Sequence, residues 1–240
     1  MSTSGEAPLG RRAALVTGAA SGIGRSVARH LVDEGMDVLA VDLEPDPHGP
    51  GVPHKADLTD PSANEGCVSA ALEQFGRLDV VVPNAGVQHV APIEEFPLER
   101  WQTILALLLT SPFQLAKSAW PALRSSGSGR LIVIASVHGL VASPFKAAYV
   151  SAKHGVLGLV KTLALEGAED DISVTAVCPA YVRTPLVEKQ ISDQARAHGM
   201  AEERVLEEVI LAPHAVKRLI EPSEVARLVG CLAGPGGAAF

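Results

Sequence analysis

Tyr149 and Lys153 are four residues apart, so on a helix their side chains lie on one face about one turn from each other. A tyrosine has an ordinary pKa of about 10, and a neighbouring ammonium favours the phenolate and lowers that pKa. Ser136 follows the apolar run Leu131–Ala135, which places its hydroxyl at the end of a buried strand. Together the three side chains predict proton transfer to or from an alcohol or carbonyl oxygen. An isolated Tyr and Lys at this spacing is more often an ordinary amphipathic pair, so the prediction depends on the rest of the chain.

A glycine-rich turn near the amino terminus has the composition of a nucleotide-binding loop. The apolar segment Arg11–Thr17 predicts a strand, and a helical pattern follows Gly18, Gly22 and Gly24. Such a turn lets the backbone approach a pyrophosphate closely, while the first N–H groups of the helix face the negative charge. The spacing is G-x-x-x-G-x-G rather than the commoner G-x-G-x-x-G. The alternative is a glycine-rich turn without a ligand.

Asp42 ends the second predicted strand, Asp37–Asp42. A carboxylate at this offset from a glycine turn accepts hydrogen bonds from an adenosine ribose and repels the additional phosphate of NADP. This predicts NAD as the cofactor. The alternative is a carboxylate that only caps the turn after the strand.

Prolines and glycines interrupt the chain over residues 43–56, where a doubly wound fold normally has a crossover helix. We expect an extended loop there, followed by a short third strand. Asp60 and Pro61 are typical of a helix start, and this helix is predicted to end near Phe75. The next buried strand, Leu78–Pro83, ends at an Asn-Ala-Gly sequence, at the edge where open parallel sheets bind ligands.

The segment Pro97–Arg124 predicts one long helix with a possible kink at Pro112. Its apolar surface is wider than core packing requires, which predicts a homo-oligomer, a dimer or tetramer, formed through the helices of residues 97–124 and 149–168. Residues 185–212 are charged and interrupted near Gly199, which favours a helical lid outside the sheet. A last helix is predicted over Pro222–Leu232.

The composition bounds the function classes. The chain of 240 residues is 47% hydrophobic and 20% charged with a net charge of −7, and this balance gives no attraction to nucleic acid or an anionic membrane. Three cysteines that are far apart in the sequence argue against a disulfide framework or a metal site, so no metal is expected. Residues 1–10 have the composition of a flexible leader without the apolar core of a signal peptide, which predicts a cytoplasmic protein.

Strands that alternate with helices predict an α/β fold, a doubly wound, Rossmann-like parallel sheet. With the glycine turn, Asn84-Ala-Gly86, Ser136, Tyr149 and Lys153 all in order, the chain resembles the short-chain dehydrogenase/reductase family over essentially its whole length. The resemblance implies one catalytic domain, residues 11–240, that includes the lid. It also implies catalysis by Ser136, Tyr149 and Lys153. The cofactor residues that it implies are Gly18, Ser21, Gly22, Ile23, Gly24, Asp42, Asp57, Leu58, Asn84, Ala85, Gly86, Tyr149, Lys153, Pro179, Val182 and Thr184.

Three segments are similar to one branch of this family, the bacterial enzymes that oxidise D-3-hydroxybutyrate. These segments are residues 84–89, 138–143 and 182–191. The resemblance implies reversible oxidation of (R)-3-hydroxybutyrate to acetoacetate with NAD. The substrate residues that it implies are Gln88, Ser136, His138, Lys146, Tyr149 and Gln190, with polar side chains that hold the carboxylate. Without it, Lys146 would be interpreted as a solvated lysine and His138 as a turn histidine.

Three positions depart from the family pattern. Leu108 stands where the family has a catalytic asparagine that supports a water relay behind the lysine, and Ala180 replaces a turn glycine. The sequence ends at Phe240, before the last strand of the family, so that strand is expected to be absent. Two alternatives therefore stay open: a dehydrogenase for another alcohol, polyol, steroid or 3-oxoacyl substrate, or an NAD-binding regulatory subunit with little turnover.

Overall fold

The protein folds around one parallel sheet. The computed structural model describes residues 11–198, 200–212 and 214–239, so the predicted leader, residues 1–10, lies outside the described residues. Among the described residues the sheet has six strands in the order β3-β2-β1-β4-β5-β6, all parallel. The strands are β1 Ala13–Thr17, β2 Asp37–Asp42, β3 Val52–Lys55, β4 Val80–Val82, β5 Gly129–Ile134 and β6 Ile172–Val177. The predicted doubly wound sheet is confirmed.

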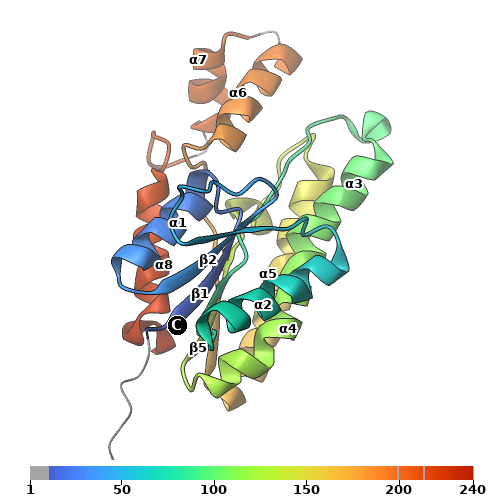
Figure 1. The fold of residues 1–240 in the computed structure, drawn as a ribbon. Helices are drawn as coiled ribbons and strands as arrows, with labels where there is room; N and C mark the ends of the chain where they lie inside the picture. Colours follow the sequence, from blue (N-terminus) through green and yellow to red (C-terminus); the bar gives the residue numbers. More distant parts are fainter. Residues whose placement is uncertain (1–10, 199, 213, 240) are drawn as a thin grey trace, which may run out of the picture.

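Helices cover both faces of the sheet (Figure 1). α1 (Gly22–Asp33) and α8 (Pro222–Ala233) pack on one face, where Val27 and Val229 are fully buried. α2 (Pro61–Phe75), α4 (Ser111–Ser125) and α5 (Ala147–Gly167) pack on the other, where Leu115 and Val156 are fully buried. Because β1 lies between β2 and β4, the chain reverses its direction of winding beside β1, and such a point opens a crevice at the carboxyl ends of the strands.

The ends of two helices follow from local side chains, as predicted. Asp60 precedes α2, and its carboxylate accepts a hydrogen bond from the backbone N–H of Ser62. Glu221 precedes α8 in a capping box with Glu224, whose carboxylate accepts from the N–H of Glu221 at 2.8 Å. β3 is the predicted short strand, and Pro53 is accommodated in it because β3 lies at the edge of the sheet.

The predicted long helix over Pro97–Arg124 is wrong in one respect. The structure has α3 (Leu98–Leu105), one π-helical turn (Ala106–Thr110) and then α4. Pro112 accounts for the break, because it has no N–H to donate to the carbonyl four residues earlier. The break is a change of helical register and not only a kink.

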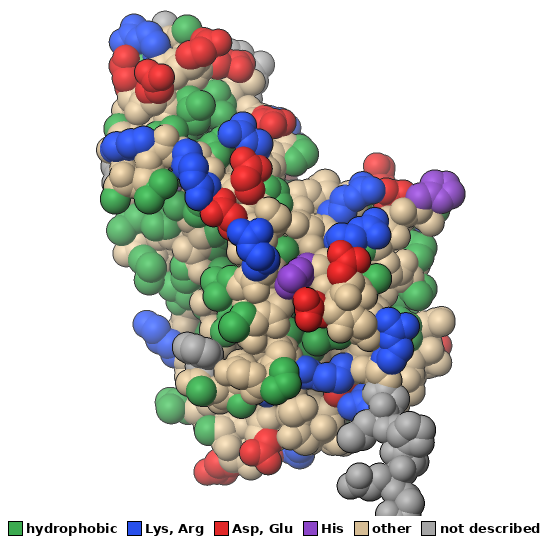
Figure 2. Space-filling model, turned by 90° about the vertical axis from the view of Figure 1, so that its left-hand side faces the viewer, with side chains coloured by type: hydrophobic (Ala, Val, Ile, Leu, Met, Phe, Trp, Pro, Cys, Tyr) green, Lys and Arg blue, Asp and Glu red, His purple; other side chains and the backbone are tan. Residues whose placement is uncertain are grey.

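The segment predicted to be a lid forms a small layer above the carboxyl edge of the sheet (Figure 1). It contains α6 (Pro185–His198), α7 (Glu202–Val205) and a π turn, Leu206–Ile210. Its own core buries Val205 and Ile210 completely. Acidic and basic side chains both cover its outer surface (Figure 2).

After α8 the described chain makes a short 3-10 helix, Pro235–Ala239, and forms no seventh strand. Within the described residues, no helix has the length and apolar character that crossing a membrane requires.

Candidate active site

A cavity of about 680 Å³ lies at the carboxyl edge of the sheet, between the strands and α6 of the lid. All the residues predicted for the cofactor line it except Gly24, which lies behind the turn, and it also brings together Ser136, Tyr149 and Lys153. Of the predicted substrate residues, Gln88, His138 and Gln190 line it as well, but Lys146 does not. One cavity thus brings together the three predicted catalytic residues and most of the residues predicted to bind the cofactor and the substrate.

The glycine turn allows a ligand to approach its backbone closely. Gly18 and Gly22 have positive φ angles of 66° and 53°, which favour glycine. A Cβ atom on Gly24 would lie 2.1 Å from the carbonyl oxygen of Gly18, so no side chain fits there. α1 begins at Gly22, and its first N–H groups are available to an anion at the turn. The turn therefore fits a pyrophosphate.

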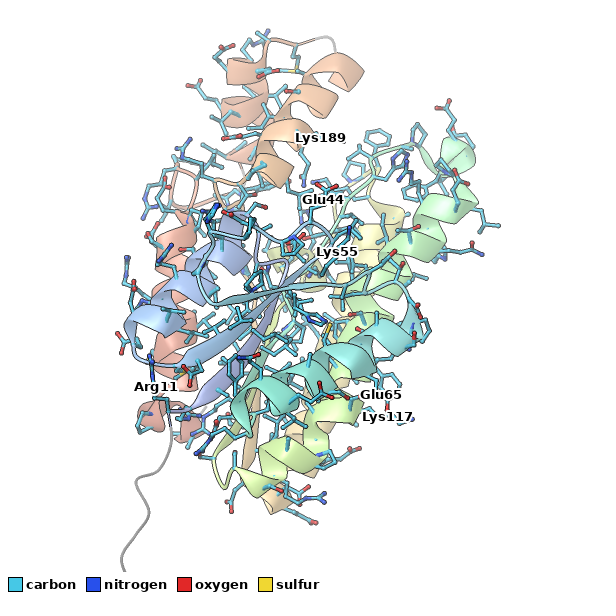
Figure 3. The ribbon with its side chains drawn as sticks, in the orientation of Figure 1. Arg11, Glu44, Lys55, Glu65, Lys117 and Lys189 are labelled. Carbon is cyan, nitrogen blue, oxygen red and sulfur yellow. The ribbon has the colours of Figure 1, made fainter. Side chains whose placement is uncertain are left out.

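Asp42 closes one end of the cavity. Its carboxylate accepts from the N–H of Ala20 at 3.0 Å and from that of Glu44 at 3.3 Å, which fixes it between the glycine turn and the end of β2. Figure 3 shows Glu44 and Lys55 at the same edge and Lys189 on α6 above them. Asp57, Leu58 and the exposed side chain of Leu43 line the neighbouring wall. A nucleoside fits this end of the cavity, with its ribose hydroxyls donating hydrogen bonds to the Asp42 carboxylate.

Asn84 joins the floor of the cavity to β1. Its side-chain amide donates to the carbonyl of Thr17 at 2.8 Å, and the hydroxyl of Thr17 accepts from the N–H groups of Asn84 and Ala85. This holds the loop after β4 against the strand that carries the glycine turn. The predicted Asn-Ala-Gly segment is therefore a structural part of the cavity wall.

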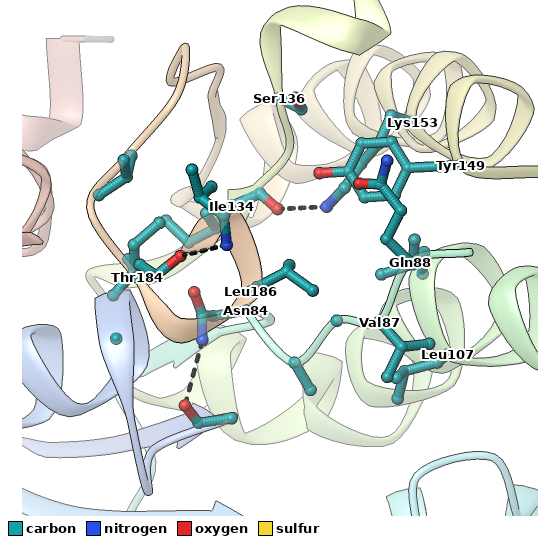
Figure 4. Close-up of a pocket in the computed structure, with 18 of the residues that line it drawn as sticks. Asn84, Val87, Gln88, Leu107, Ile134, Ser136, Tyr149, Lys153, Thr184 and Leu186 are labelled. Atoms are coloured by element: carbon teal, nitrogen blue, oxygen red, sulfur yellow. Dashed lines mark hydrogen bonds between the residues drawn. The ribbon is translucent and has the colours of Figure 1, made fainter. Parts of the chain in front are cut away.

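Ser136, Tyr149 and Lys153 gather at the other side of the cavity (Figure 4). The ammonium of Lys153 donates to the carbonyl of Ile134 at 2.8 Å and lies 5.7 Å from the centre of the Tyr149 ring. Burial lowers the pKa of Lys153 to about 8. Burial raises the pKa of Tyr149, and a hydrogen bond with Ser136 opposes that rise. That Lys153 favours the phenolate of Tyr149 stays a prediction.

Leu108 lies in the π turn and is buried among Ile104, Ala148 and Ala152, and it also lines the cavity. A second void of about 10 Å³, lined by Leu108, Ser111 and Lys153, lies beside it. This is roughly the volume that one water molecule needs. Ala180 has no left-handed backbone conformation, so the replacement of the family's glycine carries no strain.

Lys146 is buried without an acidic partner. Its side chain is 2% exposed, and its ammonium donates to the hydroxyl of Tyr181 at 2.9 Å and to the side-chain carbonyl of Gln190 at 3.4 Å. The described residues give it no salt bridge, and burial lowers its pKa to about 8. Phe145, which precedes it, has a φ of 66°, and its carbonyl accepts from the N–H of Ala91. The alternative interpretation of Lys146 as a solvated lysine is therefore wrong, and a ligand carboxylate would supply the missing negative charge.

His138 and the two glutamines complete this wall. Burial and the charge of Lys146 lower the pKa of His138 to about 4, so the ring is neutral at pH 7. Its Nε2 lies 2.8 Å from the hydroxyl of Ser143. The amide of Gln190 donates to the side-chain carbonyl of Gln88 at 2.7 Å. These polar contacts join three segments that are distant in the sequence.

Tyr181 is the residue that sequence reasoning missed. It lines the cavity, accepts from Lys146, and packs edge-to-face against His138 and His214 at 6.0 and 5.7 Å between ring centres. The loop that carries it has no periodic pattern to mark it. One signal was available: the chain has only two tyrosines, and Tyr181 lies two residues after the strand-ending Pro179.

The family model for short chain dehydrogenases matches residues 12–195. The chain belongs to the short-chain dehydrogenase/reductase family. It is 45% identical over 240 residues to a D-beta-hydroxybutyrate dehydrogenase of Rhizobium meliloti, covering 95% of this chain and 93% of that protein. It is 39% identical to one of Cupriavidus necator, covering 92% and 90%.

Two solved structures share the fold of this family. The ligand-free aldohexose dehydrogenase of Thermoplasma acidophilum is 30% identical with a TM-score of 0.89, covering 97% of this chain and 90% of the other. An actinorhodin polyketide ketoreductase with NADPH is 33% identical with a TM-score of 0.88, covering 96% and 93%. The protein is therefore an oxidoreductase of the short-chain type. Among the described residues no group of three or more His, Cys, Asp or Glu side chains could hold a metal ion.

Proposed function

We propose that this short-chain dehydrogenase interconverts (R)-3-hydroxybutyrate and acetoacetate with NAD. The observation that carries the proposal is Lys146, a buried cation without an acidic partner among the described residues, one residue contact away from the cavity that contains Tyr149. A buried cation without a counter-charge is costly, and a substrate carboxylate would offset that cost. The similarity to two D-beta-hydroxybutyrate dehydrogenases supports the same substrate.

The residues in the cavity account for the chemistry. Tyr149 takes the proton from the substrate hydroxyl in oxidation and returns it in reduction. Ser136 donates a hydrogen bond to the reacting oxygen, and Lys153 supplies positive charge beside Tyr149 when the phenolate forms. Gln88, His138 and Gln190 hold the carboxylate in front of Lys146. Orientation by this anchor places the carbon that loses hydride at a fixed position.

A dinucleotide fits the other side of the cavity. The turn at Gly18, Gly22 and Gly24 fits its pyrophosphate, and Asn84, Pro179, Val182 and Thr184 form the wall for its nicotinamide half. A bound nicotinamide would accept the hydride from the substrate. Asp42 favours NAD, because its carboxylate is held at the ribose end, where the additional phosphate of NADP would meet its charge.

We propose further that the enzyme is a cytoplasmic homo-oligomer, a dimer or tetramer. α4 and α5 both pack on the same face of the sheet, and each exposes a large apolar side chain: Phe113 is 48% exposed and Leu165 is 79% exposed. A second copy that covers these side chains would remove them from water. Size-exclusion chromatography with light scattering tests this, and a monomer would contradict it.

One observation favours a second candidate. Lys146 does not line the cavity, so an uncharged alcohol also fits the space that the structure provides. Leu108, in place of the family's asparagine, separately favours a protein of low turnover.

Formation of NADH from (R)-3-hydroxybutyrate, its (S) enantiomer and a set of uncharged secondary alcohols separates these functions. The proposal predicts that the (R) acid has the highest kcat/KM and that NAD is preferred to NADP. A preference for an uncharged alcohol would establish the second candidate, and absence of turnover with any of them would indicate the regulatory function. The variant Asp42→Ala should reduce the preference for NAD if that carboxylate sets it.

A further inference from the structure

The hydroxyl of Tyr181 has a defined direction for its proton. An ammonium can only donate, so in the 2.9 Å contact with Lys146 the phenol oxygen of Tyr181 is the acceptor. The described residues give this hydroxyl no other hydrogen-bond partner. Its own hydrogen is therefore unused by the protein. Since Tyr181 lines the cavity, that hydrogen is available to a ligand.

The same reasoning fixes the orientation of the side-chain amides of Gln88 and Gln190. The oxygen of the Gln190 amide must face Lys146, so its nitrogen faces Gln88 and donates to the Gln88 oxygen at 2.7 Å. The remaining atom, Nε2 of Gln88, is then a donor, and it is buried without a hydrogen-bond partner. An unsatisfied buried donor costs free energy unless a ligand accepts from it. The contacts of Lys146 thus leave two hydrogen-bond donors without an acceptor among the described residues: the hydroxyl of Tyr181 and Nε2 of Gln88. Both residues line the same cavity.

The ring of Tyr181 is held in place on several sides. His138 and His214 pack against it edge-to-face, with interplanar angles of 88° and 85°. The ammonium of Lys146 lies 5.1 Å from the ring centre. Burial and the neighbouring Tyr149 raise the pKa of Tyr181 to about 12, so it keeps its proton at any working pH. A fixed, protonated phenol beside a cation is a good donor to an anion.

We propose that Tyr181 is a specificity-determining residue for a 3-hydroxy acid: its hydroxyl, held by Lys146, donates to one carboxylate oxygen while the Gln88 amide donates to the same carboxylate. Lys146 then acts on the substrate through Tyr181 rather than by direct contact, which agrees with its absence from the cavity wall. No proton is transferred in this step. The inference rests on the proposed function and adds a residue to its recognition site.

The variant Tyr181→Phe tests it, because the ring that packs on His138 and His214 is kept and only the hydroxyl is lost. With NAD present, KM for (R)-3-hydroxybutyrate should rise about 10-fold, as expected for loss of a hydrogen bond to a charged group, while kcat changes little. Inhibition by butyrate, which has the carboxylate but cannot react, should weaken by about the same factor. Butyramide and an uncharged secondary alcohol of similar length should change by less than about threefold.

The matched control is Thr103→Val. It removes a hydroxyl from the same cavity, but that hydroxyl already donates to the carbonyl of Glu99 at 2.8 Å. Its constants for the acid should stay within about threefold of wild type. Equal losses for butyrate and butyramide in Tyr181→Phe, or no loss for butyrate, would overturn the inference.

The double variant Lys146→Met/Tyr181→Phe covers the case in which the single variant does not fold, because it removes the buried ammonium together with its acceptor. If the Tyr181 hydroxyl binds the carboxylate, the double variant binds butyrate more weakly than Lys146→Met alone, and equal affinity would overturn the inference. Where Tyr181→Phe folds, the double variant should lose no more affinity than Tyr181→Phe alone, and additive losses would contradict the action of Lys146 through Tyr181. Failure of the proposed function is distinguishable. If wild type oxidises no hydroxy acid, yet butyrate inhibits its oxidation of an uncharged alcohol and Tyr181→Phe weakens that inhibition, the proposed substrate is wrong and the carboxylate-recognition site stands. If butyrate does not bind wild type, this inference fails.

Discussion

Both tyrosines of the chain line the cavity, each beside a buried lysine, and the two lysine–tyrosine pairs differ in one contact. Lys153 lies 5.7 Å from the ring of Tyr149 and donates to the carbonyl of Ile134, whereas Lys146 lies 5.1 Å from the ring of Tyr181 and donates to its hydroxyl. Burial lowers the pKa of both lysines to about 8. The chain's two tyrosines are thus each placed beside a buried cation.

The difference in contact separates two uses of the same residue types. The Tyr149 hydroxyl is not an acceptor for Lys153, so it is left to Ser136 and to a reacting oxygen, as proton transfer requires. The Tyr181 hydroxyl accepts from Lys146, so it can still donate, but none of the described residues is hydrogen-bonded to it as a base. One pair is suited to moving a proton and the other to holding a charge.

Tyr149→Phe should have the largest effect. Removal of a positioned acid and base lowers kcat by about 100-fold or more, for the hydroxy acid and for an uncharged alcohol alike. Steady-state kinetics on both substrates measure it. Turnover above about a tenth of wild type would show that another group transfers the proton.

Lys146→Met should act on one substrate class. The loss of the charge that supports carboxylate binding should reduce kcat/KM for the acid by up to about 10-fold, no more than Tyr181→Phe does, and leave the uncharged alcohol nearly unchanged. Equal losses on both substrates would show that Lys146 has no part in recognising charge.

The pH dependence of the wild type gives the same separation without a mutation. The pKa of Lys146 is lowered to about 8, so its ammonium is charged below that pH and neutral above it. The ratio of kcat/KM for the acid to that for the alcohol should therefore be constant below pH 8 and fall above it. Deprotonation of Lys153 affects both substrates and cancels in the ratio. A ratio that stays constant to pH 10 would contradict the role of Lys146.

The variant Lys146→Met should also be more stable than wild type at neutral pH. Because the folded state lowers the pKa of Lys146 from 10.5 to about 8, burial of the charged form destabilises the fold below pH 8. Lys146→Met should then raise the free energy of unfolding by a few kcal/mol at pH 7. As the pH rises through 8 toward 10.5, the wild type loses that penalty and the difference should disappear. Denaturant titrations at pH 7 and pH 10.5 measure it, and equal differences at both would contradict the account.

Leu108→Asn should have the smallest effect on activity. An amide packed against Ile104, Ala148 and Ala152 costs about 1–3 kcal/mol of stability unless it pairs across the small void that Ser111 and Lys153 also line. Lys153 already donates to the Ile134 carbonyl, so kcat should change only a few-fold and KM for the acid should not change. A large gain in kcat would show that the Lys153 pair is limited by the missing asparagine.

Much of this site could be predicted from the sequence. The glycine turn, Asp42, Asn84 and the Ser136, Tyr149 and Lys153 group follow from residue types at strand ends and helical spacing. Such signals are local, and the parallel sheet brings them to one edge. The parallel sheet follows from the alternation of strands and helices, whereas the order of its strands comes only from the structure.

The rest depends on contacts between distant segments. Lys146 contacts Tyr181, which lies in the loop after β6, and Gln190, which lies in α6. These residues are distant in the sequence, so no spacing reveals the contacts. The pKa of Tyr149 depends on desolvation, which only packing determines. The π turn before Pro112 was predicted as a kink, because the missing N–H marks where the helix is disturbed but not how.

The affinity of butyrate for the two tyrosine-to-phenylalanine variants, measured by calorimetry with NAD bound, tests the separation of the two pairs most directly. Tyr149→Phe should bind butyrate within about threefold of wild type, and Tyr181→Phe should bind it about 10-fold more weakly. Equal losses in the two variants, or a loss in Tyr149→Phe alone, would contradict the separation of proton transfer from charge recognition.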